Sequence, residues 1–142
     1  MRPRHGACPL ACILCAATVV SAGARIPGWE PFIDQPIGQL EEILETLEQQ
    51  QPMNYTISNI CILYDAKLYI LFDRYLDTLE PGAVAAAVAG QALWLDARAD
   101  SVSIAASEYA GGSLSPYVAG MRFIEVTKNR IDALEEAMEG AE

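Results

Sequence analysis

Apolar residues recur at spacings of three and four along residues 39–142, and prolines and glycines interrupt this recurrence at a few places. Such spacing puts apolar side chains on one face of a helix, and no strand-like alternation persists anywhere in the chain. The sequence therefore predicts an all-α fold. Four helices joined by short turns favour an antiparallel helical bundle, with three long or medium helices and a short N-terminal helix.

The interruptions set the expected helix boundaries. Pro52 is expected to end the first helix because proline removes a helix hydrogen bond. Pro81-Gly82 separates the second helix from the third, and Gly111-Gly112 ends the third because glycine tolerates left-handed backbone. The helices are expected at about residues 39–51, 56 or 58–79, 82–109, and 113 or 115 onward.

The first half of the third expected helix, AVAAAVAGQA, is almost entirely made of small residues. Alanine is the strongest helix former. Small side chains also allow two helix backbones to approach each other closely. We therefore expect this half of the helix to pack tightly against a neighbour.

Residues 1–24 have the layout of a secretory signal peptide. Arg2 and Arg4 give a positive start, an apolar stretch covers residues 7–21, and Ala22-Gly23-Ala24 offers a cleavage site. The stretch is shorter than the roughly 20 residues of a membrane-spanning helix. The alternative is an N-terminal hydrophobic helix that stays attached. We expect cleavage, a periplasmic or secreted protein, and no membrane span afterwards.

The remaining chain divides in two. Residues 25–38, RIPGWEPFIDQPIG, hold three prolines and two glycines and are expected to form an extended leader. Residues 39–142 are expected to form a single helical domain. The sequence sets no oligomeric state for it.

Cleavage would remove most of the chemistry that catalysis uses. His5 is the only histidine, and Cys61 would be the only cysteine left. No Ser-His pair, Cys-His pair or histidine metal site is then possible, so we expect no enzyme and no cofactor. Cys61 lies on an apolar stripe and is expected to be a buried, inert thiol.

Carboxylates offer the one remaining route to catalysis. Asp73, Asp77 and Glu80 lie near one another on the second expected helix. Paired carboxylates can hydrolyse glycosides. Carboxylates on the helix of a soluble protein more often form a solvated face, and we favour that interpretation.

The charge points to a class of partner. After cleavage, seven Lys and Arg remain against 19 Asp and Glu, a difference of −12. Such a charge repels nucleic-acid phosphates and anionic lipid headgroups. It favours a cationic partner protein. The alternative is that acidity only keeps an exported protein soluble.

A mixed face stands out on the third expected helix. Gln91, Trp94 and Arg98 have the spacing i, i+3 and i+7, which places them on one side of a helix. We expect a partly buried strut, with Trp94 in the core. Arg98 is expected to be held by a carboxylate such as Asp65 or Asp73.

Four short segments follow one another in a recognisable order: D-x-x-L, Q-x-x-W with a later arginine, G-G-S, and T-x-x-R. Together they resemble the LprI-like family of lysozyme inhibitors, small exported proteins of bacteria. The likeness covers residues 65–134, about half of the chain, and implies structural roles for the matched positions. These are Asp65, Leu68, Gln91, Trp94, Arg98, Gly111, Gly112, Ser113, Thr127 and Arg130.

The chain departs from the family pattern in two respects. Tyr69 and Phe72 stand where the family commonly has Asn and Tyr, and Val102 and Arg122 stand near its customary cysteine pair. A disulfide closing such a loop of about 20 residues contributes roughly 3 kcal/mol to stability. The resemblance implies inhibition of lysozyme, a cationic peptidoglycan hydrolase. The alternative is a cell-envelope structural or adaptor protein with the same fold and no lysozyme contact.

Overall fold

The computed structural model describes residues 31–140, which form four α-helices and no strand. The helices are α1 (Asp34–Thr46), α2 (Gln50–Thr78), α3 (Pro81–Ser107) and α4 (Ser115–Glu139). The predicted all-helical fold is therefore confirmed for this part of the chain. The expected signal peptide, and residues 25–30 of the expected leader, lie outside the described residues.

Two prolines explain why the first two helices begin earlier than expected. Pro36 and Pro52 are each the third residue of a helix, α1 and α2. The first backbone N–H groups of a helix have no partner within it, so proline loses no hydrogen bond there. The prediction that residues 34–38 are extended was wrong. So was the prediction that Pro52 ends the first helix, which instead ends before Leu47.

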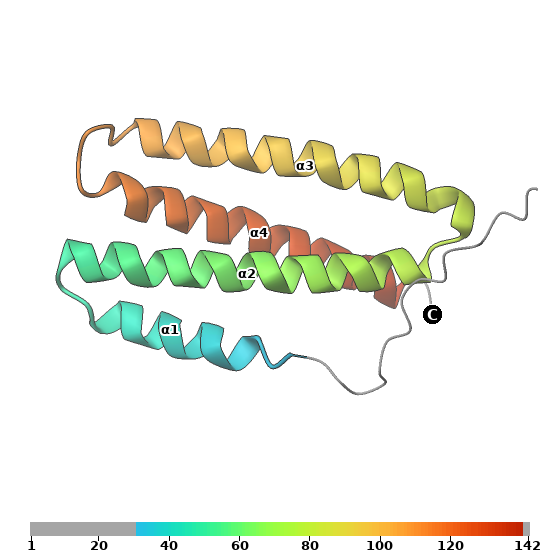
Figure 1. The fold of residues 1–142 in the computed structure, drawn as a ribbon, viewed down its shortest axis with the longest axis horizontal. Coiled ribbons are helices and arrows are strands. Elements are labelled where there is room, and N and C mark those ends of the chain that lie inside the picture. Colours follow the sequence, from blue (N-terminus) through green and yellow to red (C-terminus); the bar gives the residue numbers. More distant parts are fainter. Residues whose placement is uncertain (1–30, 141–142) are drawn as a thin grey trace, which may run out of the picture. The chain divides into compact units, whose positions relative to one another are not determined.

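Judged by which helices pack against each other, the order is α1, α2, α4, α3. α2 packs against α1 and α4, and α3 packs against α4. The path of the ribbon reverses direction at each of the three turns (Figure 1). Asn54 Nδ2 donates to the Ser113 carbonyl at 2.9 Å, and Cys61 Sγ lies 3.5 Å from the Gly120 carbonyl, so the first halves of α2 and α4 lie side by side.

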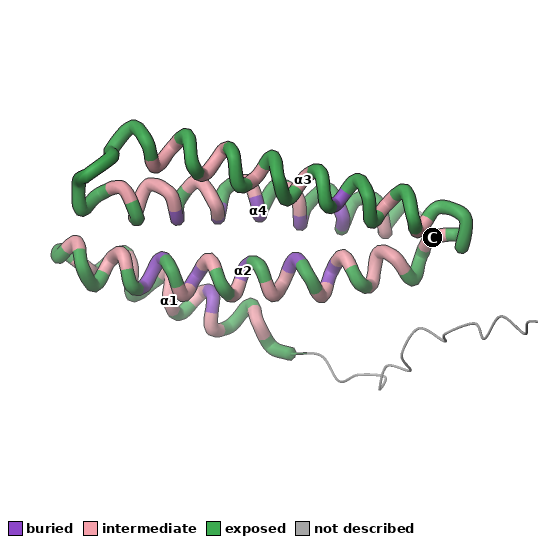
Figure 2. Tube along the Cα trace, turned by 45° about the horizontal axis from the view of Figure 1, so that its top comes forward, coloured by how far each residue is buried: buried purple, intermediate pink, exposed green. Residues whose placement is uncertain are grey.

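The core lies between α2 and α4, with Ile37 added from α1. The Ile57 side chain packs so closely on Gly120 that a Cβ there would lie 2.8 Å from Ile57 Cγ1. Figure 2 shows the buried positions on the facing sides of α2 and α4. The buried apolar residues are Ile37, Ile57, Ile60, Tyr64, Leu68, Leu71, Ile124, Ile131 and Leu134.

α3 differs from its neighbours because Gln91 is its only buried residue. The small residues of its first half are mostly exposed, and a Cβ on Gly90 would meet nothing within 4 Å. The expectation that these residues pack tightly against a neighbour was wrong. Larger apolar side chains on α3 are exposed too, including Leu93 (72%) and Ile104 (65%). A helix that is apolar on every side is usually buried. α3 instead exposes apolar surface that no described residue covers.

Candidate functional site

Arg98 of α3 joins three helices. Its NH1 lies 2.8 Å from Asp65 Oδ1 on α2 and donates to Thr127 Oγ1 on α4 at 3.2 Å. Its guanidinium carbon lies 4.2 Å from the ring centroid of Phe123 and 5.1 Å from that of Trp94. The Arg98 side chain is 11% exposed and that of Asp65 is 55% exposed, so the ion pair opens to solvent on one side. The prediction that a carboxylate such as Asp65 or Asp73 holds Arg98 is confirmed for Asp65.

A second arginine completes this polar cluster. Arg130 Nε donates to Gln91 Oε1 at 3.0 Å, and its guanidinium carbon lies 5.8 Å from the Trp94 ring centroid. Trp94 is half-buried, and both guanidinium groups lie over its ring. Within the described residues, no buried side-chain nitrogen or oxygen lacks a hydrogen-bond partner. Satisfied groups of this kind fix the positions of helices relative to one another.

The structure thus brings together six of the ten motif residues: Asp65, Gln91, Trp94, Arg98, Thr127 and Arg130. Leu68 is buried in the adjoining core. Gly111, Gly112 and Ser113 lie apart from the cluster, in the turn between α3 and α4. Gly111 has φ +81°, the left-handed conformation that the sequence predicted for this turn.

Arg122 provides a contact near the place where the family resemblance implies a disulfide. Arg122 Nε donates to Ser101 Oγ at 2.7 Å, which links α4 to α3 beside Val102. Arg122 NH1 also lies 2.9 Å from Glu125 on its own helix. A polar contact therefore joins the two helices that a cysteine pair at these positions would join.

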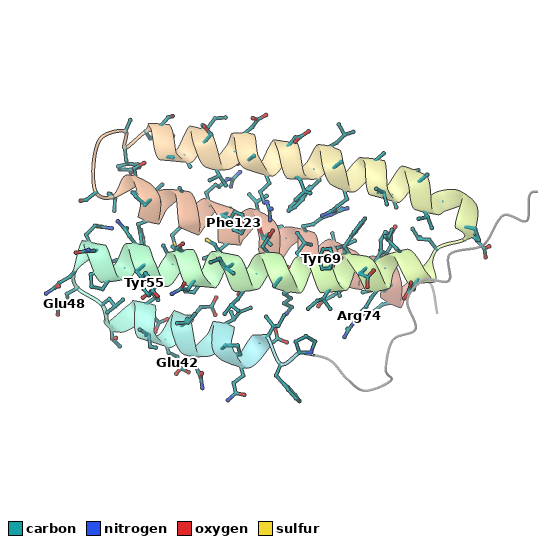
Figure 3. The ribbon with its side chains drawn as sticks, viewed as in Figure 1. Glu42, Glu48, Tyr55, Tyr69, Arg74 and Phe123 are labelled. Carbon is teal, nitrogen blue, oxygen red and sulfur yellow. The ribbon has the colours of Figure 1, made fainter. Side chains whose placement is uncertain are left out.

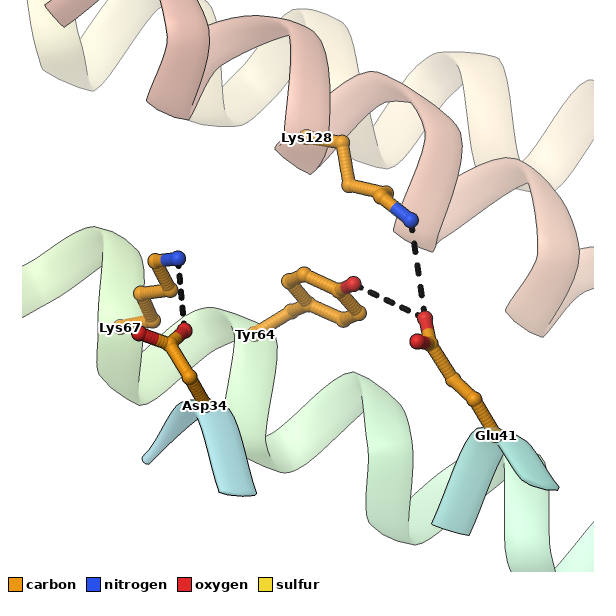
Figure 4. Close-up of polar contacts among 5 residues, drawn as sticks. All are labelled: Asp34, Glu41, Tyr64, Lys67 and Lys128. Atoms are coloured by element: carbon orange, nitrogen blue, oxygen red, sulfur yellow. Dashed lines mark hydrogen bonds and ion pairs between the residues drawn. The ribbon is translucent and has the colours of Figure 1, made fainter. Parts of the chain in front are cut away.

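Sequence reasoning missed a second polar group, which lies between α1, α2 and α4 (Figure 4). Tyr64 donates its hydroxyl hydrogen to Glu41 Oε1 at 2.9 Å, and Lys128 Nζ lies 3.6 Å from the same oxygen. Burial, reinforced by Glu41 and opposed by Lys128, raises the pKa of Tyr64. The pKa of Lys128 is also raised, chiefly by the Tyr64 hydroxyl. At neutral pH the tyrosine is neutral and the lysine charged, which suits a structural contact.

Cys61 is half-buried beside Gly120. Desolvation by burial raises the pKa of its thiol to about 11, so the reactive thiolate is scarce at neutral pH. The thiol is half-buried and not fully buried as predicted, and its raised pKa favours the unreactive protonated form. In residues 31–140 no group of three or more His, Cys, Asp or Glu side chains is arranged to hold a metal ion.

An open groove of about 330 Å³ lies between α2 and α3, and we call it the α2–α3 groove. Its walls are largely apolar, and Asp65 and Gln91 of the polar cluster reach it. Because α3 packs against α4 and makes few contacts with α2, the groove stays open along one side. The lining residues are Asp65, Leu68, Tyr69, Phe72, Val88, Gln91, Ala92 and Leu95.

A second hollow of about 370 Å³ lies between α1, α2 and α4 and contains the Glu41 and Lys128 side chains. Both of these charged groups already face each other across it. The hollow is therefore more polar than the α2–α3 groove and offers a ligand less free apolar surface.

No protein-family model, curated protein or solved structure matches this chain. The resemblance to the LprI-like family therefore rests on its motifs alone and stays a prediction. None of the described helices combines the length and the apolar character that crossing a membrane requires.

Proposed function

We propose that this chain is an exported acidic binding protein that inhibits lysozyme-type peptidoglycan hydrolases. In this proposal residues 34–139 form an antiparallel bundle of three long helices and one short helix. The convergence of three separate motif segments on Arg98 supports the family resemblance, because residues that act together in a fold must meet in space.

The distribution of charge is the observation that carries the proposal. Residues 31–140 contain six Lys and Arg against 17 Asp and Glu, a difference of −11. Several of the cations are engaged within the protein: Lys67, Arg98, Arg122 and Lys128 each lie within 4 Å of a carboxylate. The surface is therefore negative, and it attracts a basic partner at long range.

Two sets of exposed carboxylates lie on α1 and at the end of α4. Glu42, Glu45 and Glu48 are exposed on α1 and just after it, and Figure 3 shows Glu42 and Glu48 at the outside of the fold. The second set lies at the end of α4 and consists of Asp132, Glu135, Glu136 and Glu139. Either set can lie against the basic rim of an enzyme cleft.

Inhibition of this kind needs no reacting group. A lysozyme must admit a polysaccharide strand into its cleft, and a rigid helical protein held over the cleft prevents entry. Electrostatic attraction between exposed groups is screened over about 10 Å at 0.1 M salt. We therefore expect inhibition that weakens as salt rises, mainly through slower association.

The test is the lysis of a cell-wall suspension by lysozyme, with and without the mature protein, across a salt series. We expect near-stoichiometric inhibition at low salt. Cytochrome c, which is equally basic, should compete poorly. Polyglutamate of similar charge is the control for acidity alone. If folded protein fails to inhibit at low salt, or polyglutamate inhibits equally, the proposal is wrong for the enzyme tested.

Matched variants locate the contact. The triple variant Glu42→Gln, Glu45→Gln, Glu48→Gln removes three negative charges from the α1 side. The triple variant Asp132→Asn, Glu135→Gln, Glu136→Gln removes three from the end of α4. Their net charges are equal, so a difference in inhibition between them identifies the face that contacts lysozyme.

The second candidate function is that of a cell-envelope adaptor, and the exposed apolar surface of α3 favours it. An inhibitor that acts by charge has no need of such a surface. A pull-down from cell-envelope extract with the mature protein separates the two functions. Capture of an envelope protein together with failure to inhibit lysozyme would favour the adaptor.

A further inference from the structure

We propose that the α2–α3 groove is a docking site for a basic amphipathic helix of another protein. This inference concerns a surface other than the two acidic sets described above, and it does not depend on lysozyme inhibition. It rests on the apolar walls of the groove, on an exposed stripe along α2, and on the charges beside them.

The walls of the groove have the spacing that receives a helix. Val88, Ala92 and Leu95 follow one another at i, i+4 and i+7 on α3, so they form one continuous ridge. Across the groove, α2 contributes Leu68 and Phe72, also four residues apart. A groove between two helices with apolar side chains at these spacings binds the apolar face of a third helix.

An exposed stripe on α2 meets this surface at Tyr69. Tyr55, Ile62 and Tyr69 are seven residues apart, and each is at least 63% exposed. Residues at this spacing stay on nearly the same side of a helix, which is the pattern of a helix–helix seam. The stripe is about 21 Å long, equal to four helical turns of a partner. Figure 3 labels the two tyrosines at its ends, and Tyr69 also lines the groove.

The charges beside the groove select a basic partner. The lining contains no Lys or Arg, and its one carboxylate, Asp65, is paired with Arg98 while remaining 55% exposed. On α3, Asp96 follows Ala92 by one turn and Asp100 follows Asp96 by another, and both are exposed. A helix with lysine or arginine on both flanks of its apolar face places those cations near these carboxylates.

The same charges disfavour a second copy of this chain as the occupant. In a symmetric dimer the same surface patch of each subunit faces its partner. The exposed carboxylates of Asp96 and Asp100 from one copy would then lie in the same interface as those of the other. Like charges facing each other across an interface oppose association.

The direct test uses a fluorescein-labelled peptide of about 18 residues, long enough for the stripe, with leucines on one helix face and lysines on the other. Fluorescence anisotropy at physiological salt measures its binding to the mature protein. We expect saturable 1:1 binding, with a gain of peptide helicity in circular dichroism. A peptide of the same composition with its leucines scattered should bind at least about tenfold more weakly.

Three variants of the protein test whether the peptide binds in the groove. Tyr69→Gln together with Leu95→Gln should weaken binding by about tenfold, because both apolar walls are lost. Leu93→Gln is the matched control, since Leu93 is exposed on α3 and does not line the groove. It should change affinity by less than about twofold. Asp96→Asn should weaken binding slightly and reduce its dependence on salt.

Three results would overturn the proposal. They are equal binding of the scattered peptide, equal weakening by Leu93→Gln, and a dimer of the free protein in sedimentation that the double variant dissociates. The last result would assign the groove to a second copy of the chain. If the double variant does not fold, Tyr69→Gln alone decides the matter, because Tyr69 is 75% exposed and contributes little to the core.

Discussion

The α2–α4 interface and α3 use similar apolar residues in opposite ways. Between α2 and α4 the apolar stripes face each other, and Ile60 is completely buried. On α3 apolar residues occur on every side, and the single buried residue is the polar Gln91. Arg98, Arg130 and the contact of Arg122 with Ser101 tie α3 to its neighbours by polar contacts. Hydrophobic packing thus dominates between α2 and α4, while α3 adds directional polar contacts and leaves much of its apolar surface open.

The largest expected effect compares the same substitution in the two regions. Ile60→Ala should lower the free energy of unfolding by about 2–5 kcal/mol, because it leaves a cavity in a packed core. Ile104→Ala on α3 should lower it by less than about 0.5 kcal/mol, since Ile104 is exposed. Urea denaturation of both variants measures the difference. Equal losses would show that α3 is buried to the same degree as α2.

The next prediction concerns the arginine that attaches α3. Arg98→Ala should lower the free energy of unfolding by about 2–3 kcal/mol, because it removes an ion pair, a hydrogen bond to buried Thr127 and the stacking on Phe123. Arg98→Lys keeps the charge but loses the planar stacking, so it should recover less than half of this loss. Chemical denaturation of both variants is the measurement, and full recovery by lysine would show that charge alone matters.

Two glycines should respond to alanine with opposite signs. Gly111 has φ +81°, so Gly111→Ala should destabilise the protein by about 1 kcal/mol. Gly90 lies inside α3 with open space around it, so Gly90→Ala should stabilise the protein by up to about 1 kcal/mol. Thermal melts of the two variants give the signs. Destabilisation by Gly90→Ala would mean that the face of α3 at Gly90 is packed against something.

The smallest effect on stability at neutral pH is expected for Cys61, which lies at the α2–α4 interface. Its pKa is raised from 9.0 to about 11 in the folded protein, so the fold favours the protonated thiol. The stability that this contributes is fully present below pH 9 and is lost as pH rises through 11. At pH 8 the thiol should react with iodoacetamide about 100-fold more slowly than a free cysteine with pKa 9. In urea the reaction should become fast, and a Cys61→Ser variant should lack it altogether.

Most of the correct predictions came from the local spacing of residues along helices and from the pairing of opposite charges. The i, i+3 and i+7 spacing of Gln91, Trp94 and Arg98 placed them on one face. Opposite charge offered Asp65 or Asp73 as the partner of Arg98, and the structure shows Asp65. Two predictions failed because the effect of proline depends on its position in a helix. Proline stops a helix from within but is tolerated in its first turn, as at Pro36 and Pro52.

The remaining features depend on tertiary packing that local sequence does not encode. Alanine-rich sequence forms a helix wherever that helix packs, so it did not indicate that α3 is mostly exposed. The group formed by Glu41, Tyr64 and Lys128 comes from three helices with no shared spacing. The α2–α3 groove exists because α3 packs along α4 and touches α2 mainly through the Arg98–Asp65 pair.

Amide hydrogen exchange tests the central claim, that α2 and α4 form the stable core while α3 presents an open face to a partner. In the free protein the amides of α3 should exchange faster than the buried stretches of α2 and α4, because few buried contacts oppose local opening. With saturating Leu/Lys peptide, protection should increase on α3 and at the Tyr69 side of α2, and stay unchanged on α1. Protection of α3 equal to that of α2 in the free protein, or no change on adding the peptide, would contradict the account.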